Sequence, residues 1–133
     1  MQKILVLVFV CIGTSSVYSQ DPVLNGTWVP VKQEFAGNPL PGSVFEKQKL
    51  IIKDTTYTFM AEGLDKGILH FQENKMDIFG KEGVNTGKHF TAIYKYENNE
   101  LTICYNLKGD AYPNNFETKT GPLLFLSVFK KTE

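Results

Sequence analysis

Arginine is absent from this chain of 133 residues, so all 14 of its basic residues are lysines. Without a guanidinium fork, bidentate recognition of phosphate or carboxylate by arginine is excluded. The lysines balance 14 acidic residues, which gives a formal net charge of zero. Nucleic acid is therefore not expected as a partner, because binding it needs an excess of positive charge.

Cysteine is also scarce, with Cys11 near the N-terminus and Cys104 far along the chain. If the N-terminal segment is removed, Cys104 has no cysteine to pair with, and the fold is stabilised by packing without a disulfide. Cys104 stands between Ile103 and Tyr105 with no positive residue beside it. We therefore expect an inert thiol that behaves as a small hydrophobic side chain.

Long hydrophobic runs are missing as well. The longest, Ile4–Ile12, has nine residues, far short of the roughly 20 that span a bilayer. Lys3 precedes it and a small, polar segment follows, which is typical of a signal peptide. Val17 and Ser19 fit the recognition positions of signal peptidase, so we predict a signal peptide over residues 1–19 and a periplasmic or secreted protein.

Two other interpretations of this segment are not favoured. A transmembrane segment is not predicted, because the apolar run is too short. Lipoprotein anchoring through Cys11 is disfavoured because Val10 precedes it, where such a site has a small residue.

Residues 20–133 are enough for one domain with a modest core. Apolar and polar residues alternate in short segments, and no helical period exceeds about one turn. The predicted strands are 28–35, 50–53, 56–62, 66–71, 75–79, 89–97, 100–107 and 123–130, with a short helical turn at 43–47. About eight short strands favour a sandwich or an up-and-down barrel. Pro30 lacks a backbone donor, so a bulge or kink is expected in the first strand.

The period-two pattern places apolar residues on a common face of the sheet. The predicted inner wall contains Leu50, Ile52, Tyr57, Phe59, Phe90, Ala92, Tyr94, Leu101, Ile103 and Tyr105. A sheet that is apolar on one face must close or stack to bury it. The last strand is apolar on both faces, so we expect another segment, residues 36–47, to cover its outer side.

Three blocks of residues carry a resemblance to a known family. They are Leu24–Trp28 followed by Gly37, Pro39 and Pro41; Gly87-Lys88 followed by Ala92–Tyr94; and Leu101–Tyr105 followed by Gly109 and Pro113. Together they resemble a lipocalin-like domain family of secreted bacterial proteins whose biochemical role is not established. The resemblance covers residues 20–133 and implies an antiparallel up-and-down barrel closed at one end by Trp28.

The chain departs from this pattern where the relatives have arginine. The family usually has an arginine before the loop proline, where Tyr112 stands here, and lipocalins commonly place a last-strand arginine over the tryptophan. Only Lys130 or Lys131 could take that second place, as a cation–π partner. Cytosolic fatty-acid-binding proteins share the Gly-Thr-Trp opening, but they need an arginine and about ten strands, so they fit less well.

Catalytic motifs are not found. The sequence contains no Gly-x-Ser-x-Gly, no His-Glu-x-x-His and no phosphate-binding glycine loop. His70 and His89 stand 19 positions apart, without the close ligand pairs of a zinc site. We therefore predict no enzymatic activity, no metal and no cofactor.

The aromatic residues of the inner wall favour two functions. The first is binding of a small hydrophobic ligand inside the barrel, with the candidate residues Trp28, Tyr57, Phe59, Phe90, Tyr94 and Tyr105. An eight-stranded barrel is just wide enough for its own side chains or one small guest. The second hypothesis is therefore a filled barrel that acts as a protein-interaction or inhibitor module through its loops, 80–87 and 108–122. Tyr112 and Phe116 of the longer loop are expected to cover the barrel mouth or to contact a partner protein.

Overall fold

The structure is a computed structural model, and it describes residues 21–132. The predicted signal peptide, with Cys11, lies outside the described residues. The elements are η1 (Pro22–Leu24), β1 (Gly26–Phe35), β2 (Asn38–Pro39), α1 (Gly42–Phe45), β3 (Lys49–Lys53), β4 (Thr56–Met60), β5 (Leu64–Gln72), β6 (Lys75–Gly83), β7 (His89–Glu97), β8 (Glu100–Asn106) and β9 (Leu124–Thr132). In residues 21–132, no helix has the length and apolar character needed to cross a membrane.

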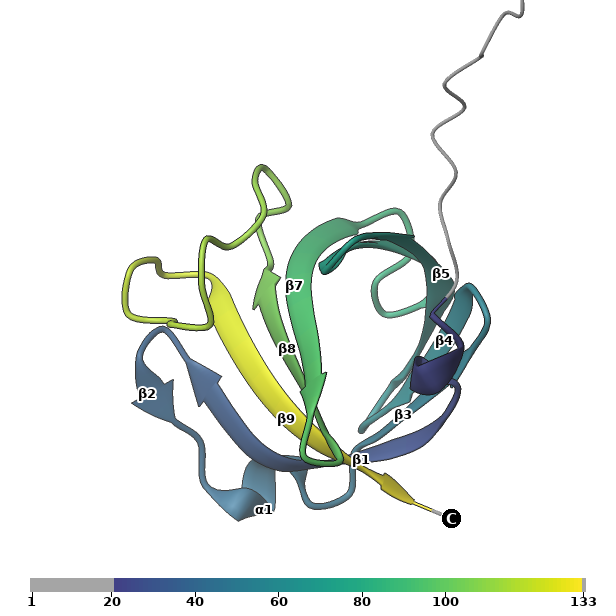
Figure 1. Ribbon diagram of the computed structural model, residues 1–133, viewed down its shortest axis with the longest axis horizontal. Coiled ribbons are helices and arrows are strands. Elements are labelled where there is room, and N and C mark those ends of the chain that lie inside the picture. The colour runs from purple at the N-terminus through teal and green to yellow at the C-terminus, as the bar shows by residue number, and fades with distance from the viewer. Residues whose placement is uncertain (1–20, 133) are drawn as a thin grey trace, which may run out of the picture.

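The strands form one closed antiparallel barrel. From β3 to β9 each strand pairs with the next one along the chain, and β1 pairs with both β3 and β9. The eight strands β1 and β3–β9 thus close on themselves, while the short β2 extends the sheet beside the end of β1 (Figure 1). The predicted all-β, up-and-down barrel, with a short helical turn after the first strand, is confirmed.

The first strand is bulged where its proline stands. Pro30 pairs with Phe129 of β9 and Lys32 pairs with Val128, so Val31 is an extra residue in β1. This confirms the irregularity expected at Pro30, whose ring nitrogen donates no hydrogen bond. The bulge also shifts the alternation of faces, so that Gln33 becomes buried beyond it.

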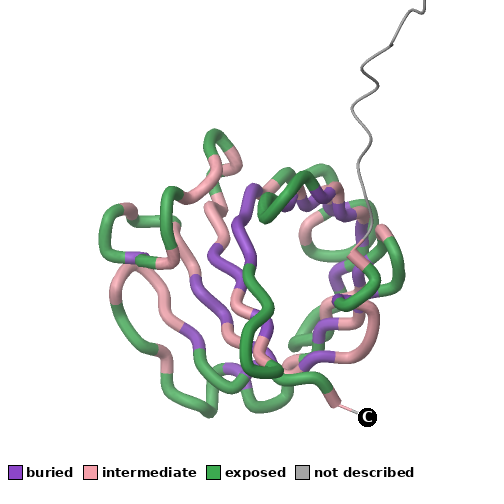
Figure 2. Tube along the Cα trace, viewed as in Figure 1, coloured by how far each residue is buried: buried purple, intermediate pink, exposed green. Residues whose placement is uncertain are grey.

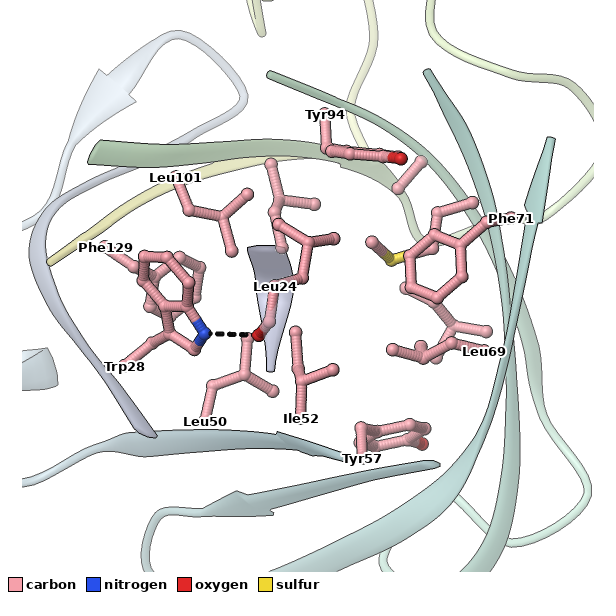
Figure 3. Close-up of a cluster of buried hydrophobic side chains, with 14 residues drawn as sticks. Leu24, Trp28, Leu50, Ile52, Tyr57, Leu69, Phe71, Tyr94, Leu101 and Phe129 are labelled. Atoms are coloured by element: carbon pink, nitrogen blue, oxygen red, sulfur yellow. Dashed lines mark hydrogen bonds between the residues drawn. The ribbon is translucent and has the colours of Figure 1, made fainter. Parts of the chain in front are cut away.

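One end of the barrel is closed by Trp28 and the η1 turn. Trp28 and Leu24 are fully buried, and the indole Nε1 donates a hydrogen bond of 2.8 Å to the Leu24 carbonyl oxygen (Figure 3). Lys131 of β9 lies over the indole, with Nζ 5.4 Å from the ring centroid, which confirms the expected cation–π contact. A Cβ on Gly26 would lie 2.5 Å from Lys131 Cε, so the glycine makes room for this lysine.

The outer face of the last strands is also covered, but not by the segment expected. Ile93, Cys104 and Leu126 form a second buried cluster, and Tyr112 and Phe116 of the loop 107–123 pack against it. The prediction that residues 36–47 cover this face is therefore wrong. Thr118 accepts a hydrogen bond from the Gly37 backbone N–H, which ties the loop to the β1–β2 turn beside it (Figure 1).

The pattern of burial along the strands is the one expected for a closed barrel. Buried and more exposed positions alternate on most strands, and the turn tips are exposed (Figure 2). Asn98 and Asn99, between β7 and β8, have φ angles of 53° and 62°, as the predicted tight hairpin turn requires.

We expect Trp28→Ala to lower the free energy of unfolding by about 3–5 kcal/mol, because it leaves a cavity at the closed end and removes a buried hydrogen bond. The measurement is urea unfolding followed by circular dichroism. Val31→Ala at the exposed bulge is the control and should change stability by less than about 0.5 kcal/mol. Equal losses in both variants would contradict the role given to the indole.

Candidate functional site: a cavity inside the barrel

The barrel interior holds a cavity of about 100 Å³. Most of its lining is apolar, and the residues are Gln33, Leu50, Ile52, Tyr57, Phe59, Asp65, Leu69, Met76, Ile78, Ile103, Tyr105, Phe125 and Phe129. An engineered apolar cavity of about 150 Å³ accepts benzene. The space inside this barrel therefore suits a compact guest with few heavy atoms.

A surface cleft of about 850 Å³ lies at the end of the barrel opposite Trp28. Its lining comes from α1 and the residues after it, from the β4–β5 turn, and from the segment after β6; it includes Val44, Lys47, Glu62, Val84 and Asn85. Phe59 belongs to the lining of both the cleft and the cavity. We call this cleft the mouth.

Asp65 places a carboxylate in the wall of the cavity. Its exposed fraction is 6 %. The Tyr57 hydroxyl donates to Asp65 Oδ1 at 3.0 Å, and Asn85 Nδ2 donates to Asp65 Oδ2 at 2.9 Å. These three residues form the polar cluster of the site, drawn from β4, β5 and the loop after β6.

A second irregularity of the sheet positions this cluster. The register between β5 and β6 shifts after Lys66, so that Gly67 pairs with Gly80 and Lys81 is the extra residue. A Cβ on Gly67 would lie 2.0 Å from the Phe79 carbonyl oxygen and 2.7 Å from Tyr57 Cε1. Only glycine therefore lets the Tyr57 ring lie across β5 and reach Asp65.

Burial keeps the phenols of the cavity protonated. It raises the pKa of the Tyr57 hydroxyl well above its usual range, and the charge and hydrogen bond of Asp65 add to the shift. Burial raises the pKa of Tyr105 in the same way, with smaller contributions from Tyr57 and Asp65. Tyr57 is therefore a hydrogen-bond donor to Asp65 throughout the physiological pH range.

Gln33 is the other polar side chain of the lining and is buried. Its Nε2 atom donates to Gln48 Oε1 at 2.7 Å and to Ser127 Oγ at 3.3 Å. The donors of this amide are thus used inside the barrel, where they link β1 to β9 and to the segment after α1.

The six predicted ligand-binding residues separate into two groups. Tyr57, Phe59 and Tyr105 line the cavity. Trp28, Phe90 and Tyr94 are outside the lining and belong to the packed core. The Tyr94 hydroxyl donates to Asp21 and to the Glu73 carbonyl oxygen, and burial, followed by the charge of Asp21, raises its pKa to about 12.

The predicted mouth residues lie elsewhere. Tyr112 and Phe116 pack on the outer wall, so the expectation that they cover the mouth is wrong. The Lys75 ammonium lies 5.2 Å from the Tyr112 ring centroid, and that of Lys95 lies 4.7 Å from the Phe116 centroid. The loop turns back onto the barrel because the outer face of β7–β9 is apolar and gains from being covered.

The two histidines lie near each other on the outer face of the barrel, with the ring of Phe79 between them. His70 and His89 flank the ring of Phe79, at centroid distances of 5.0 and 4.6 Å, and His89 Nε2 lies 2.7 Å from Asp77 Oδ1. The Tyr112 hydroxyl donates to the other oxygen of Asp77. Within residues 21–132, no group of three or more histidine, cysteine or acidic side chains is arranged to hold a metal ion.

Sequence reasoning missed Asp65, Gln33 and Asn85. Asp65 has a usable signal, because extending the predicted strand back from 66 to 64 puts Asp65 on the face of Leu69 and Phe71. The bulge at Val31 reverses the alternation of faces after it, so a regular period of two does not predict that Gln33 points inward. Asn85 follows β6, which continues to Gly83, beyond the predicted end at 79.

No family model, no curated protein and no solved structure matches the chain. The function of the cavity is therefore argued from its geometry and chemistry.

Tyr112 and Phe116 pack against the buried cluster that contains Cys104, so we expect its thiol to react slowly. Burial, and to a lesser extent Glu34, raises the pKa of this thiol to about 11. At pH 8 the thiolate fraction is then about 100-fold below that of a thiol with its ordinary pKa, so we expect reaction with a disulfide reagent to be at least that much slower in the folded protein than in urea. A Cys11→Ser background leaves Cys104 as the sole thiol, and Phe116→Ala should accelerate its reaction. A reaction rate in the folded protein close to the rate in urea would contradict the protection of Cys104 by this loop.

Proposed function

We propose that this chain is an exported, lipocalin-like barrel that binds a small hydrophobic ligand non-covalently. The observation that carries the proposal is a mostly apolar cavity in the barrel, with a few convergent polar groups and a wall residue, Phe59, shared with the mouth. Export and the family resemblance rest on the N-terminal segment and on the Gly26-Thr27-Trp28 opening. The guest enters from the mouth past Phe59.

The size of the cavity limits the ligand. Each buried CH₂ group contributes about 0.8 kcal/mol, so a compact branched alkyl group gains useful affinity from burial alone. A longer acyl chain does not fit into about 100 Å³ and would extend into the mouth. We therefore propose compact guests in preference to long-chain lipids.

Isopentanol is a suitable probe, and its binding is followed by ¹⁵N–¹H NMR titration. We expect saturable shifts in amides of the cavity wall, among them those of Leu69, Ile78 and Ile103. Leu69→Phe fills part of the cavity and should weaken binding by about tenfold or more, because overpacking excludes the guest. Val31→Phe on the exposed bulge is the control and should bind as the wild type does. Absence of saturable shifts at the highest soluble isopentanol concentration would refute the proposal.

The protein-interaction hypothesis is favoured by a different observation, an apolar rim around the mouth. Val44, Met60, Leu64 and Val84 are exposed there, with exposed fractions of 51 % for Val44 and 63 % for Val84. Exposed apolar groups that gather on one face are typical of a contact surface. The second candidate function is thus an interaction module that uses this rim in place of Tyr112 and Phe116.

A double variant, Val44→Ser with Val84→Ser, tests this second function. If the rim binds an extracytoplasmic protein, the variant should lose that protein in affinity capture, because both substitutions remove apolar contact area. Val23→Ser, exposed near the closed end, is the matched control and should retain it. Capture of the same proteins by the double variant would count against the rim.

A further inference from the structure

We propose that the cavity selects a compact guest with a primary ammonium group, which pairs with the Asp65 carboxylate while the alkyl part fills the apolar wall. This inference rests on the proposed function and names its ligand class. Its starting point is an imbalance of charge inside the barrel. Among the described residues that line the cavity, Asp65 is the one charged side chain, and no lysine or histidine accompanies it.

The carboxylate is costly to bury and is not explained by packing. An ionised acid in an apolar interior loses its hydration, and it is retained when partners replace the lost water. Tyr57 and Asn85 each supply one neutral donor. A carboxylate has about four acceptor positions, so it has the capacity for further donors. A neutral acceptor could bind the same two donors, so the negative charge needs another reason.

The other polar groups of the wall do not supply a cation. Gln33 directs its amide nitrogen to Gln48 and Ser127. Tyr105 lines the cavity, and it is a neutral phenol because burial raises its pKa. A ligand carboxylate would therefore meet a like charge at Asp65, with no arginine anywhere in the chain to offset it.

The charges around the mouth also favour a positively charged guest. Its lining includes Glu46 and Glu62 against the single ammonium of Lys47. Asp65 stands opposite Phe59 in the β4–β5 pair, at the boundary between mouth and cavity. An ammonium group held there lies toward the mouth, while its alkyl part points at Leu69, Ile78 and Ile103 of the wall. Excess negative charge at an opening concentrates cations near it.

The test compares three guests of nearly equal shape, isopentylamine, isopentanol and isovalerate, by NMR titration at pH 7. We expect isopentylamine to bind at least about tenfold more tightly than isopentanol, because a charged donor on a charged acceptor strengthens the hydrogen bond. Isovalerate should bind most weakly. Asp65→Asn should reduce the affinity for the amine to that for the alcohol and leave the alcohol within about twofold, since it removes the charge and retains the shape.

One further variant and one further measurement make the result specific. Asp77→Asn removes an acid from the outer face, so it should leave the preference for the amine unchanged; an equal loss there would overturn the inference in favour of general surface attraction. If Asp65→Asn does not fold, the ¹³C chemical shift of the Asp65 carboxyl carbon in the wild-type protein decides the question. It should move clearly more on titration with isopentylamine than with isopentanol, and equal movement with both guests would overturn the inference.

The outcomes separate the two proposals. Equal binding of the amine and the alcohol, unaffected by Asp65→Asn, would overturn the ammonium inference and leave the hydrophobic cavity as the binding site. Tighter binding of isovalerate than of isopentylamine would also overturn it. If none of the three guests shifts the amides of the cavity wall, the proposed function itself fails.

Discussion

The pairing of β1 with β9 is the constraint on which the rest of the structure depends. It joins the first and last long strands of the described chain and turns an open sheet into a cylinder of eight strands. The number of strands sets the diameter of a barrel, and eight leave room for side chains and at most a small guest. The small size of the cavity follows from closing the sheet at this number of strands.

Within that cylinder the two ends have different chemistry. At the closed end, Trp28, Leu24 and Leu101 are fully buried in the core cluster, and the indole N–H is satisfied by a backbone carbonyl. At the other end, polar side chains enter the wall at or near a bulge: Gln33 after the extra residue Val31, and Asp65 beside the shift at Lys66. Bulges re-aim side chains and increase local curvature, which is why they often lie next to functional sites. One half of the interior thus supplies stability, and the other supplies a cavity with specific polar groups.

The candidate site could be predicted in part. Tyr57, Phe59 and Tyr105 were found because each lies in a strand whose alternation is regular. Trp28 and Tyr94 point inward as expected, but they pack in the core away from the cavity, and alternation alone cannot distinguish the two ends of a barrel. Asp65 and Gln33 were missed because an acid and an amide on an inner face violate the apolar pattern, and a bulge hides the face of Gln33. Tyr112 and Phe116 were misplaced because nothing in a loop's own composition says which surface it covers.

The amino-acid sequence by itself determined the class of fold and the approximate strands and hairpins, because these depend on neighbouring residues and on a period of two. The closing role of Trp28 and its contact with a lysine of the last strand were implied by the resemblance that the Gly26-Thr27-Trp28 opening carries. Tertiary structure alone decided which inner residues surround empty space, where the carboxylate of Asp65 finds its donors, and which face the loop 107–123 covers. The physical reason is that these properties arise from contacts between strands far apart in the chain. Such contacts depend on bulges and on the register around the closed barrel, and a one-residue shift moves a side chain from one face to the other.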